Sequence, residues 1–240
     1  MGHSSQPHWH CPPSTPVERK RQTANNPLPK EGDEEIQFNF YTDKSDLTEV
    51  QIPETVKGIG AEAFMNCTSL VSVNVPKSVY HMAGAVFTNC TSLKTATIPA
   101  MRTAGPRMFM GCSALEEVNF DSDLCYIEIF CGCSSLKTVN LSENLKEIAS
   151  RTFKDCTSLE KIVLPASLKE IHAYAFEGCT SLKTLEFKGV PKTIHRRAFA
   201  KLKGIQSLII PEGSYESFAQ MLPKTIMKKA NQSGGTSLCQ

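Results

Sequence analysis

Asp155-Cys-Thr-Ser-Leu-Glu-Lys-Ile-Val-Leu-Pro165 is one copy of a motif that recurs along the chain and decides its fold. Six copies align on Cys and Leu, and the steps from one Leu to the next are 23, 22, 21, 23 and 23 residues. The Cys and Leu pairs are Cys67 with Leu70, Cys90 with Leu93, Cys112 with Leu115, Cys133 with Leu136, Cys156 with Leu159, and Cys179 with Leu182. A period of this length is typical of a solenoid, in which each unit buries its apolar face only by stacking on its neighbours.

A Phe stands three residues before each of the six cysteines, so Phe and Cys together mark the predicted core of every repeat. A degenerate seventh copy places Leu202 at the Cys position, and an opening half-repeat begins at Leu47. The predicted structural core consists of Phe64, Cys67, Phe87, Cys90, Phe109, Cys112, Phe130, Cys133, Phe153, Cys156, Phe176, Cys179 and Phe199.

Two apolar patterns within each repeat predict two short strands. Ile162 and Leu164 alternate with polar residues and are followed by Pro165, which predicts a half-buried strand that the proline ends. A Leu-Lys-Glu-Ile stretch such as 168–171 predicts a second short strand with its Lys and Glu facing water. The Ala-Phe-x-x-Cys stretch then turns the chain back, and we expect a helical or 3₁₀ turn there. The fold class is therefore a β-rich solenoid of about seven to eight coils.

The full pattern Leu-x-x-Ile-x-x-x-Ala-Phe-x-x-Cys-x-Ser-Leu-x-x-Val-x-Leu-Pro resembles the BspA-like leucine-rich repeats, also called the Treponema pallidum type. The resemblance covers about residues 47–211 and implies a right-handed leucine-rich-repeat solenoid. Ile210-Pro-Glu-Gly-Ser-Tyr-Glu-Ser-Phe-Ala-Gln-Met-Leu222 resembles the family's terminal repeat running into a capping helix. Ser214 as N-cap and apolar residues at helical spacing, Phe218 among them, support that helix.

Two repeats depart from the pattern. The step into Leu115 lacks one residue, and the following unit loses two residues between Ile127 and Phe130. A shortened coil should bulge or change the local twist of the solenoid. We interpret it as tolerated drift in coil length, and a partner-specific irregularity is the alternative.

Composition and charge set the domain organisation. Residues 1–35 are rich in Pro, Ser, Asn and charge, which predicts a disordered tail; residues 36–222 form the solenoid with its cap, and residues 223–240 form a flexible basic tail. The net charge of +2 argues against nucleic acid as a partner, and no apolar run is long enough to span a membrane. The N-terminus has no apolar signal segment, which favours a cytoplasmic location; a cell-surface or secreted location is the alternative. A monomer is the default.

The ten cysteines raise the question of redox or metal chemistry. Six occupy one position of a buried pattern, and Leu202, which can neither ligate a metal nor form a disulfide, replaces Cys there in the seventh copy. The position therefore selects a small apolar residue, which free Cys resembles. Cys125 and Cys131 lie outside the pattern, and whether they pair or react stays open.

No constellation for catalysis, cofactor binding or metal binding emerges. His172 and His195 are 23 residues apart and share one position in adjacent coils, but the neighbouring coil has Ala149 there, so no third ligand is evident. A surface histidine pair is the stronger interpretation. Phosphate-binding glycine loops, HExxH and nucleophile elbows are absent from the sequence, and we expect a protein without enzyme activity.

The outward positions of the main strands are the predicted binding surface, because solenoids bind along such faces. They are polar, mixed in sign and without aromatic residues, and an ordinary solvated sheet face is the competing interpretation. The candidate protein-binding residues are Lys94, Thr95, Glu116, Glu117, Asn119, Lys137, Thr138, Asn140, Glu160, Lys161, Lys183 and Glu186.

The sequence thus predicts a protein-interaction module or scaffold that binds a protein or peptide on this face, without a cofactor. The alternative is a cell-surface or secreted adhesion protein, which the family resemblance alone implies.

Overall fold

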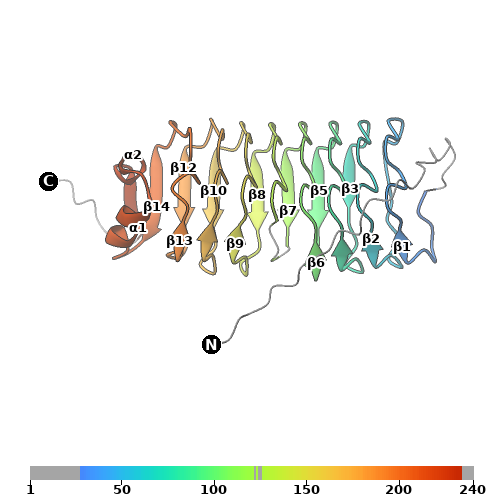
Figure 1. Ribbon diagram of the computed structural model, residues 1–240, viewed down its shortest axis with the longest axis horizontal. Helices are drawn as coiled ribbons and strands as arrows, with labels where there is room; N and C mark the ends of the chain where they lie inside the picture. Colours follow the sequence, from blue (N-terminus) through green and yellow to red (C-terminus); the bar gives the residue numbers. More distant parts are fainter. Residues whose placement is uncertain (1–27, 122, 124–125, 234–240) are drawn as a thin grey trace, which may run out of the picture.

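A computed structural model describes residues 28–121, 123 and 126–233 of the 240-residue chain. The chain winds into about seven coils that stack in a row along the long axis, with two helices at the C-terminal end (Figure 1). The predicted solenoid is confirmed. Of the N-terminal tail that we expected over residues 1–35, residues 1–27 lie outside the described part.

The main strands form the larger face of the solenoid and pair in parallel with their counterparts in neighbouring coils. Four of them make one sheet and four make a second. The first sheet holds β3 (Ser72–Asn74), β5 (Thr95–Ile98), β7 (Glu117–Phe120) and β8 (Thr138–Leu141). The second holds β10 (Lys161–Leu164), β12 (Thr184–Phe187), β14 (Ser207–Pro211) and β15 (Ala230–Ser233).

The Leu-Lys-Glu-Ile stretches form the predicted short strands, also in parallel. One sheet contains β1 (Glu35–Ile36), β2 (Gly58–Ile59), β4 (His81–Met82) and β6 (Thr103–Ala104). The other contains β9 (Glu147–Ile148), β11 (Glu170–Ile171) and β13 (Thr193–Ile194). The strand pairing keeps the spacing of the repeat, so that Glu147 stands opposite Glu170.

A ladder of parallel aromatic rings runs through the core, one ring per coil. Neighbouring ring centres are 5.0–5.8 Å apart and the rings are tilted by only 7–14°. Tyr41 begins the ladder at the Phe position of the first coil, 23 residues before Phe64, a role that the sequence analysis missed. The ladder then continues through Phe87, Phe109, Phe130, Phe153 and Phe176 to Phe199.

The stretch around each Phe turns the chain without forming a helix in any of the described coils, which differs from the helical or 3₁₀ turn that we expected. The residue before each repeat cysteine is left-handed, with φ between 59° and 78°. Gly and Asn tolerate this conformation best, and Asp tolerates it better than most other residues. The positions are Asn66, Asn89, Gly111, Gly132, Asp155 and Gly178.

Each repeat cysteine is fully buried and has a hydrogen-bonding role in addition to its packing role. The thiol of Cys156 donates to the carbonyl oxygen of Phe130 in the preceding coil at 3.2 Å. Five more thiols make the equivalent bond at 3.0–3.2 Å: those of Cys67, Cys90, Cys112, Cys133 and Cys179. Apolar packing alone would accept Ala or Val, whereas this bond requires a small side chain that can also donate.

Burial should protect these thiols from alkylation, and two neighbouring cysteines allow a direct comparison. Burial raises the pKa of both thiols, but Cys131 is half-buried and Cys133 is fully buried. We expect iodoacetamide to modify Cys131 in the native protein and to leave Cys133 unmodified until the chain unfolds. Mass spectrometry of digested samples measures each site. Equal native labelling of the two residues would show that Cys133 is not enclosed.

The ladder of main strands is interrupted beside the shortened coil, because β8 does not pair with β10. The 21-residue step from Leu115 to Leu136 keeps β7 in register with β8, and the break falls at the following 23-residue step, from Leu136 to Leu159. In the short-strand ladder, the position between β6 and β9 falls on residues 124 and 125, which lie outside the described residues. The turns that contain the core Phe residues remain hydrogen-bonded from coil to coil. The backbone amide of Phe109 donates to the carbonyl oxygen of Ile129 at 2.9 Å, and the backbone amide of Phe130 donates to the carbonyl oxygen of Thr152 at 2.9 Å.

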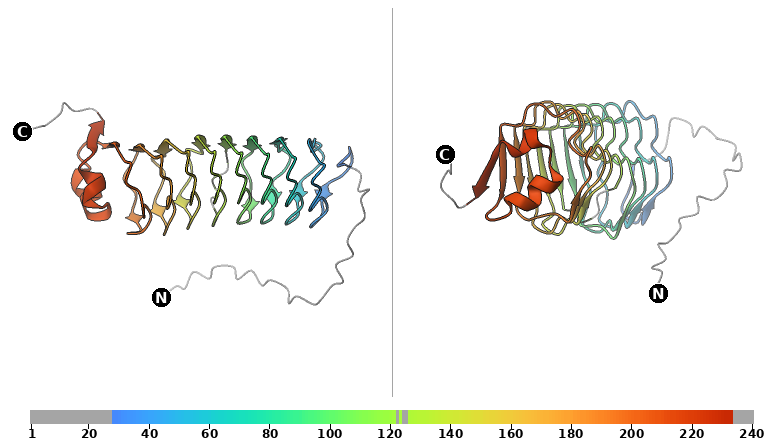
Figure 2. Two further views of the ribbon diagram at one scale, coloured as in Figure 1. Left: turned by 90° about the horizontal axis from the view of Figure 1, so that it is seen from above. Right: turned by 60° about the vertical axis from the view of Figure 1, so that its left-hand side comes forward.

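A cap closes the C-terminal end of the core. It consists of α1 (Tyr215–Met221) and α2 (Lys224–Met227), the red helices at one end of the stack in Figure 2. Phe218 of α1 packs on Phe187 with ring centres 4.7 Å apart. Ser214 precedes α1 as predicted, but its hydroxyl donates to the carbonyl of Pro211 and does not cap the helix.

The ordered chain extends further than we expected. We placed a flexible tail from residue 223 onward, yet α2 buries Ile226 and Met227, and β15 pairs with β14. The apolar residues of α2 cover the last coil, so this segment belongs to the cap. No helix within residues 28–121 and 126–233 is long and apolar enough to cross a membrane.

Candidate functional site

The strand ribbon, defined here as the outward side chains of β3, β5, β7, β8, β10, β12 and β14 and of the residue before each strand, contains every predicted binding residue. All of the residues predicted for it are exposed except Glu186, which is half-buried. The alternation of buried and exposed residues in β5 and β7 shows why: apolar side chains point to the core and polar ones to solvent.

Ion pairs between neighbouring coils order the charges of the ribbon. Lys137 contacts Glu116 at 2.8 Å, and this hydrogen bond lowers the pKa of Glu116. Lys188 contacts the carboxylate of Glu186 at 2.6 Å and Lys161 contacts it at 2.9 Å. These two hydrogen bonds lower the pKa of Glu186. Lys137 therefore pairs toward β7 and Lys161 toward β12, each within its own sheet.

A cleft of about 490 Å³ opens on the ribbon where the main sheet is interrupted. It lies between β8 and β10, and no ion pair among the described residues spans it. We call it the ribbon cleft. It is lined by Lys137, Thr138, Val139, Asn140, Leu141, Glu143, Lys161, Val163 and Pro165.

The ribbon cleft exposes groups that the rest of the ribbon keeps covered. Val139 and Leu141 of β8 are half-buried, whereas the apolar residues of β5 and β7 are buried. The amides of Lys183 and Thr184 both donate to the carbonyl of Glu160, at 2.9 and 3.1 Å. At the cleft, the corresponding amides are those of Glu160 and Lys161, and they find no such backbone acceptor among the described residues. The cleft therefore offers apolar surface together with backbone donors.

Sequence reasoning identified the rim of the cleft but not its floor. Thr138, Asn140 and the two lysines were predicted as ribbon residues, while Val139 and Leu141 were not. Alternation along the strand predicts that apolar residues of the pattern are buried, so only the shortened step before Leu136 could have indicated otherwise.

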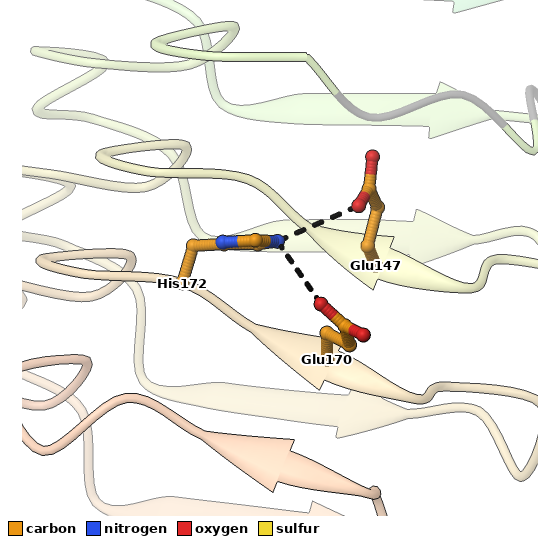
Figure 3. A group of neighbouring side chains, drawn as sticks. All are labelled: Glu147, Glu170 and His172. Atoms are coloured by element: carbon orange, nitrogen blue, oxygen red, sulfur yellow. Dashed lines mark ion pairs between the residues drawn. The ribbon is translucent and has the colours of Figure 1, made fainter. Parts of the chain in front are cut away.

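The two histidines that share a position in adjacent coils have different partners. The imidazole of His195 accepts a hydrogen bond from the backbone amide of Arg197 through Nδ1, at 3.1 Å. His172 instead points its Nε2 toward Glu147 and Glu170 (Figure 3). The structure thus places carboxylates at His172 that the sequence analysis did not consider. Of the two non-repeat cysteines, Cys131 is half-buried, and Cys125 lies outside the described residues.

The comparisons with known proteins point to one kind of repeat. A family model described as the BspA type leucine rich repeat region, in six copies, matches residues 34–129 and 126–222. No curated protein matches the chain.

Two solved structures share the fold over most of the chain. A leucine-rich repeat protein from Bacteroides ovatus is 26% identical with a TM-score of 0.68, and the match covers 83% of this chain and 54% of that one. A leucine-rich repeat protein from Eubacterium ventriosum is 29% identical with a TM-score of 0.60, covering 64% of this chain and 42% of that one. The chain thus spans about half the length of these proteins or less.

Proposed function

Because the chain belongs to the BspA-type leucine-rich repeat family, we propose that it is a protein-interaction module that binds a protein or peptide on the strand ribbon, anchored at the ribbon cleft. Leucine-rich repeat proteins of this kind are generally interaction or surface-type modules. The observation that carries the proposal is the interrupted sheet, since it turns an otherwise flat polar face into a concave one.

The groups in the cleft indicate an extended peptide segment as the bound element. Half-buried Val139 and Leu141 offer apolar contact within the cleft. The amide of Lys161, which lines the cleft, can donate to a peptide carbonyl or a carboxylate, in the way that an open strand edge does. The lysines at the rim are already paired with Glu116 and Glu186, so they favour contact through balanced polar groups over attraction to a strongly charged partner.

This function needs no chemical step, and the family to which the chain belongs is typically non-enzymatic. Burial raises the pKa of the core thiols, which makes them poor nucleophiles. The adhesion role implied by the family would use the same ribbon in an extracellular setting. Measuring where the protein resides decides between an intracellular and a surface role.

We expect that filling the cleft weakens partner binding. Peptides are selected from a random displayed library on the immobilised full chain, and their affinities are measured for Thr138→Arg and Thr95→Arg. Both threonines are exposed and begin equivalent strands, but only Thr138 lines the cleft. Thr138→Arg should weaken binding by at least about tenfold, or about 1.4 kcal/mol, while Thr95→Arg should leave it nearly unchanged.

Two results would contradict the proposal. An affinity of Thr138→Arg equal to that of the unmodified chain would remove the cleft from consideration. Equal losses of affinity in Thr138→Arg and Thr95→Arg would place binding across the whole ribbon rather than at its interruption. Both variants should melt at the temperature of the unmodified chain, because the side chains are exposed.

A further inference from the structure

One histidine and two glutamates from adjacent coils converge on the sheet of short strands, away from the strand ribbon. Glu147 lies in β9, Glu170 lies in β11, and His172 follows β11 directly. The His172 Nε2 atom is 3.4 Å from Oε2 of Glu147 and 3.7 Å from Oε2 of Glu170. Figure 3 shows the imidazole edge facing both carboxylates, and one ligand atom from each residue lies within 4.8 Å of the other two.

The two carboxylates are held together by the fold. Glu147 and Glu170 are direct partners in the parallel ladder of β9 and β11, so their backbone positions are set by the stacking of the coils. Like charges placed opposite each other on neighbouring strands repel, and they are destabilising unless a cation lies between them. In no other described strand pair do two acidic residues stand opposite each other. A positive group between the two carboxylates would therefore relieve their repulsion.

We propose that Glu147, Glu170 and His172 bind a divalent cation of the Zn²⁺ type. One imidazole nitrogen with two carboxylate oxygens suits Zn²⁺ and similar transition metals, whereas Mg²⁺ and Ca²⁺ favour sites made of oxygen alone. Three protein ligands leave at least one coordination position open for water or for a ligand from another molecule. This differs from our expectation of no metal site, which rested on the missing third ligand at the position of Ala149.

The distances fit such an ion. Bonds of about 2.1 Å in a tetrahedral site place neighbouring ligand atoms about 3.4 Å apart. The two distances from His172 Nε2 are 3.4 and 3.7 Å, and the third pair needs to close from at most 4.8 Å. The three side chains are 41–54% exposed, so small rotations bring the oxygens to an ion without disturbing the core.

The neighbouring coil has the same histidine position but lacks the carboxylate two residues before it. His195 follows β13 as His172 follows β11, but Thr193 stands in register with Glu170, and Nδ1 of His195 accepts a backbone hydrogen bond. His195 is therefore a matched control. The inference is independent of peptide binding, since the ribbon cleft shares none of these residues.

The test is a Zn²⁺ titration of the full chain with ¹⁵N-labelled histidine, followed by NMR of the imidazole nitrogens. A residue-specific signal is required, because His3, His8, His10 and Cys11 also offer ligands by residue type. The His172 resonance is assigned by its loss in His172→Ala. Zn²⁺ should shift it in a saturable manner.

The variants separate a metal site from a simple ion pair. Loss of an outer-shell partner alone weakens metal binding about 10- to 100-fold, so Glu147→Gln and Glu170→Gln should each raise the half-saturating Zn²⁺ concentration at least about tenfold. His195→Ala and Glu160→Gln should leave it unchanged. The proposal is wrong, and the cluster is an ion pair only, if the His172 resonance does not respond to Zn²⁺. It is equally wrong if the two glutamate variants respond at the same Zn²⁺ concentration as the unmodified chain.

Discussion

Above about pH 9 the solenoid should lose stability at about 8 kcal/mol per pH unit, a far steeper loss than a protein without buried thiols shows. Burial raises the pKa of all six core thiols from about 9, to about 12 at Cys67 and Cys179 and further at Cys90, Cys112, Cys133 and Cys156. The folded chain keeps these protons while the unfolded chain releases them. Their contribution is therefore fully present below pH 9 and is lost as the pH rises toward the folded values.

The slope follows from the number of protons that the two states bind. Each thiol ionised only in the unfolded state costs about 1.4 kcal/mol of stability per pH unit. With a total stability on the order of 10 kcal/mol, the protein should unfold within about two pH units above 9. Guanidinium unfolding in the presence of a reductant, at a series of pH values from about 7 to 10, measures the slope.

A double variant provides the control. Cys112→Ala with Cys156→Ala removes two of the six groups and should reduce the slope by about a third, whatever its stability at neutral pH. Each of the two substitutions also removes a thiol-to-carbonyl hydrogen bond, which lowers the stability of the protein at every pH alike. An unchanged slope would mean that ionisation of the core thiols does not govern alkaline unfolding.

Phe130→Ala should destabilise the protein by about 3–5 kcal/mol and uncouple its two halves. Phe130 is fully buried, stacks on Phe109 and Phe153, and meets Phe120 edge-on with centres 5.5 Å apart. The main-strand ladder is interrupted beside this coil, so the aromatic ladder and the turns around it connect the two halves. In a solenoid, cooperativity depends on contacts between neighbours. Amide hydrogen exchange measures the free energy of opening in each half.

Phe87→Ala is the matched control, because Phe87 is equally buried but lies where both sheets are continuous. Its loss of stability should be similar and should appear in the exchange of both halves alike. For Phe130→Ala we expect the two halves to open with different free energies. If both halves still open together, the sheets or the loops transmit cooperativity across the interruption without the aromatic ladder.

Much of the fold could be predicted from the repeat. The period places each Phe, Cys and Leu beside its counterpart, so the buried ladder and the two strands per coil follow from stacking alone. Interactions that arise only between coils could not be predicted in the same way. The bond from the Cys156 thiol to the Phe130 carbonyl joins positions 26 residues apart, and residue type alone indicated only a small apolar side chain.

The candidate sites divide in the same manner. The polar rim of the ribbon follows from strand alternation, and Thr138 and Asn140 were predicted there. The cleft depends on which strand leaves its ladder beside a shortened coil, and the shortening before Leu136 does not specify that β8 stays with β7. His172 was weighed as a ligand, but its carboxylate partners occupy a different position of the repeat.

The sequence by itself determined the architecture of this protein: a stack of coils with a Phe and Cys core, short parallel strands and a helical cap. It could do so because a regular period makes sequence spacing equivalent to spatial contact. Only the tertiary structure decided where that equivalence fails. Beside the shortened coil, β8 and β10 do not pair and a cleft opens, and between β9 and β11 the stacking brings Glu147, Glu170 and His172 together. Both features depend on the distances between coils, which the order of residues along one coil does not contain.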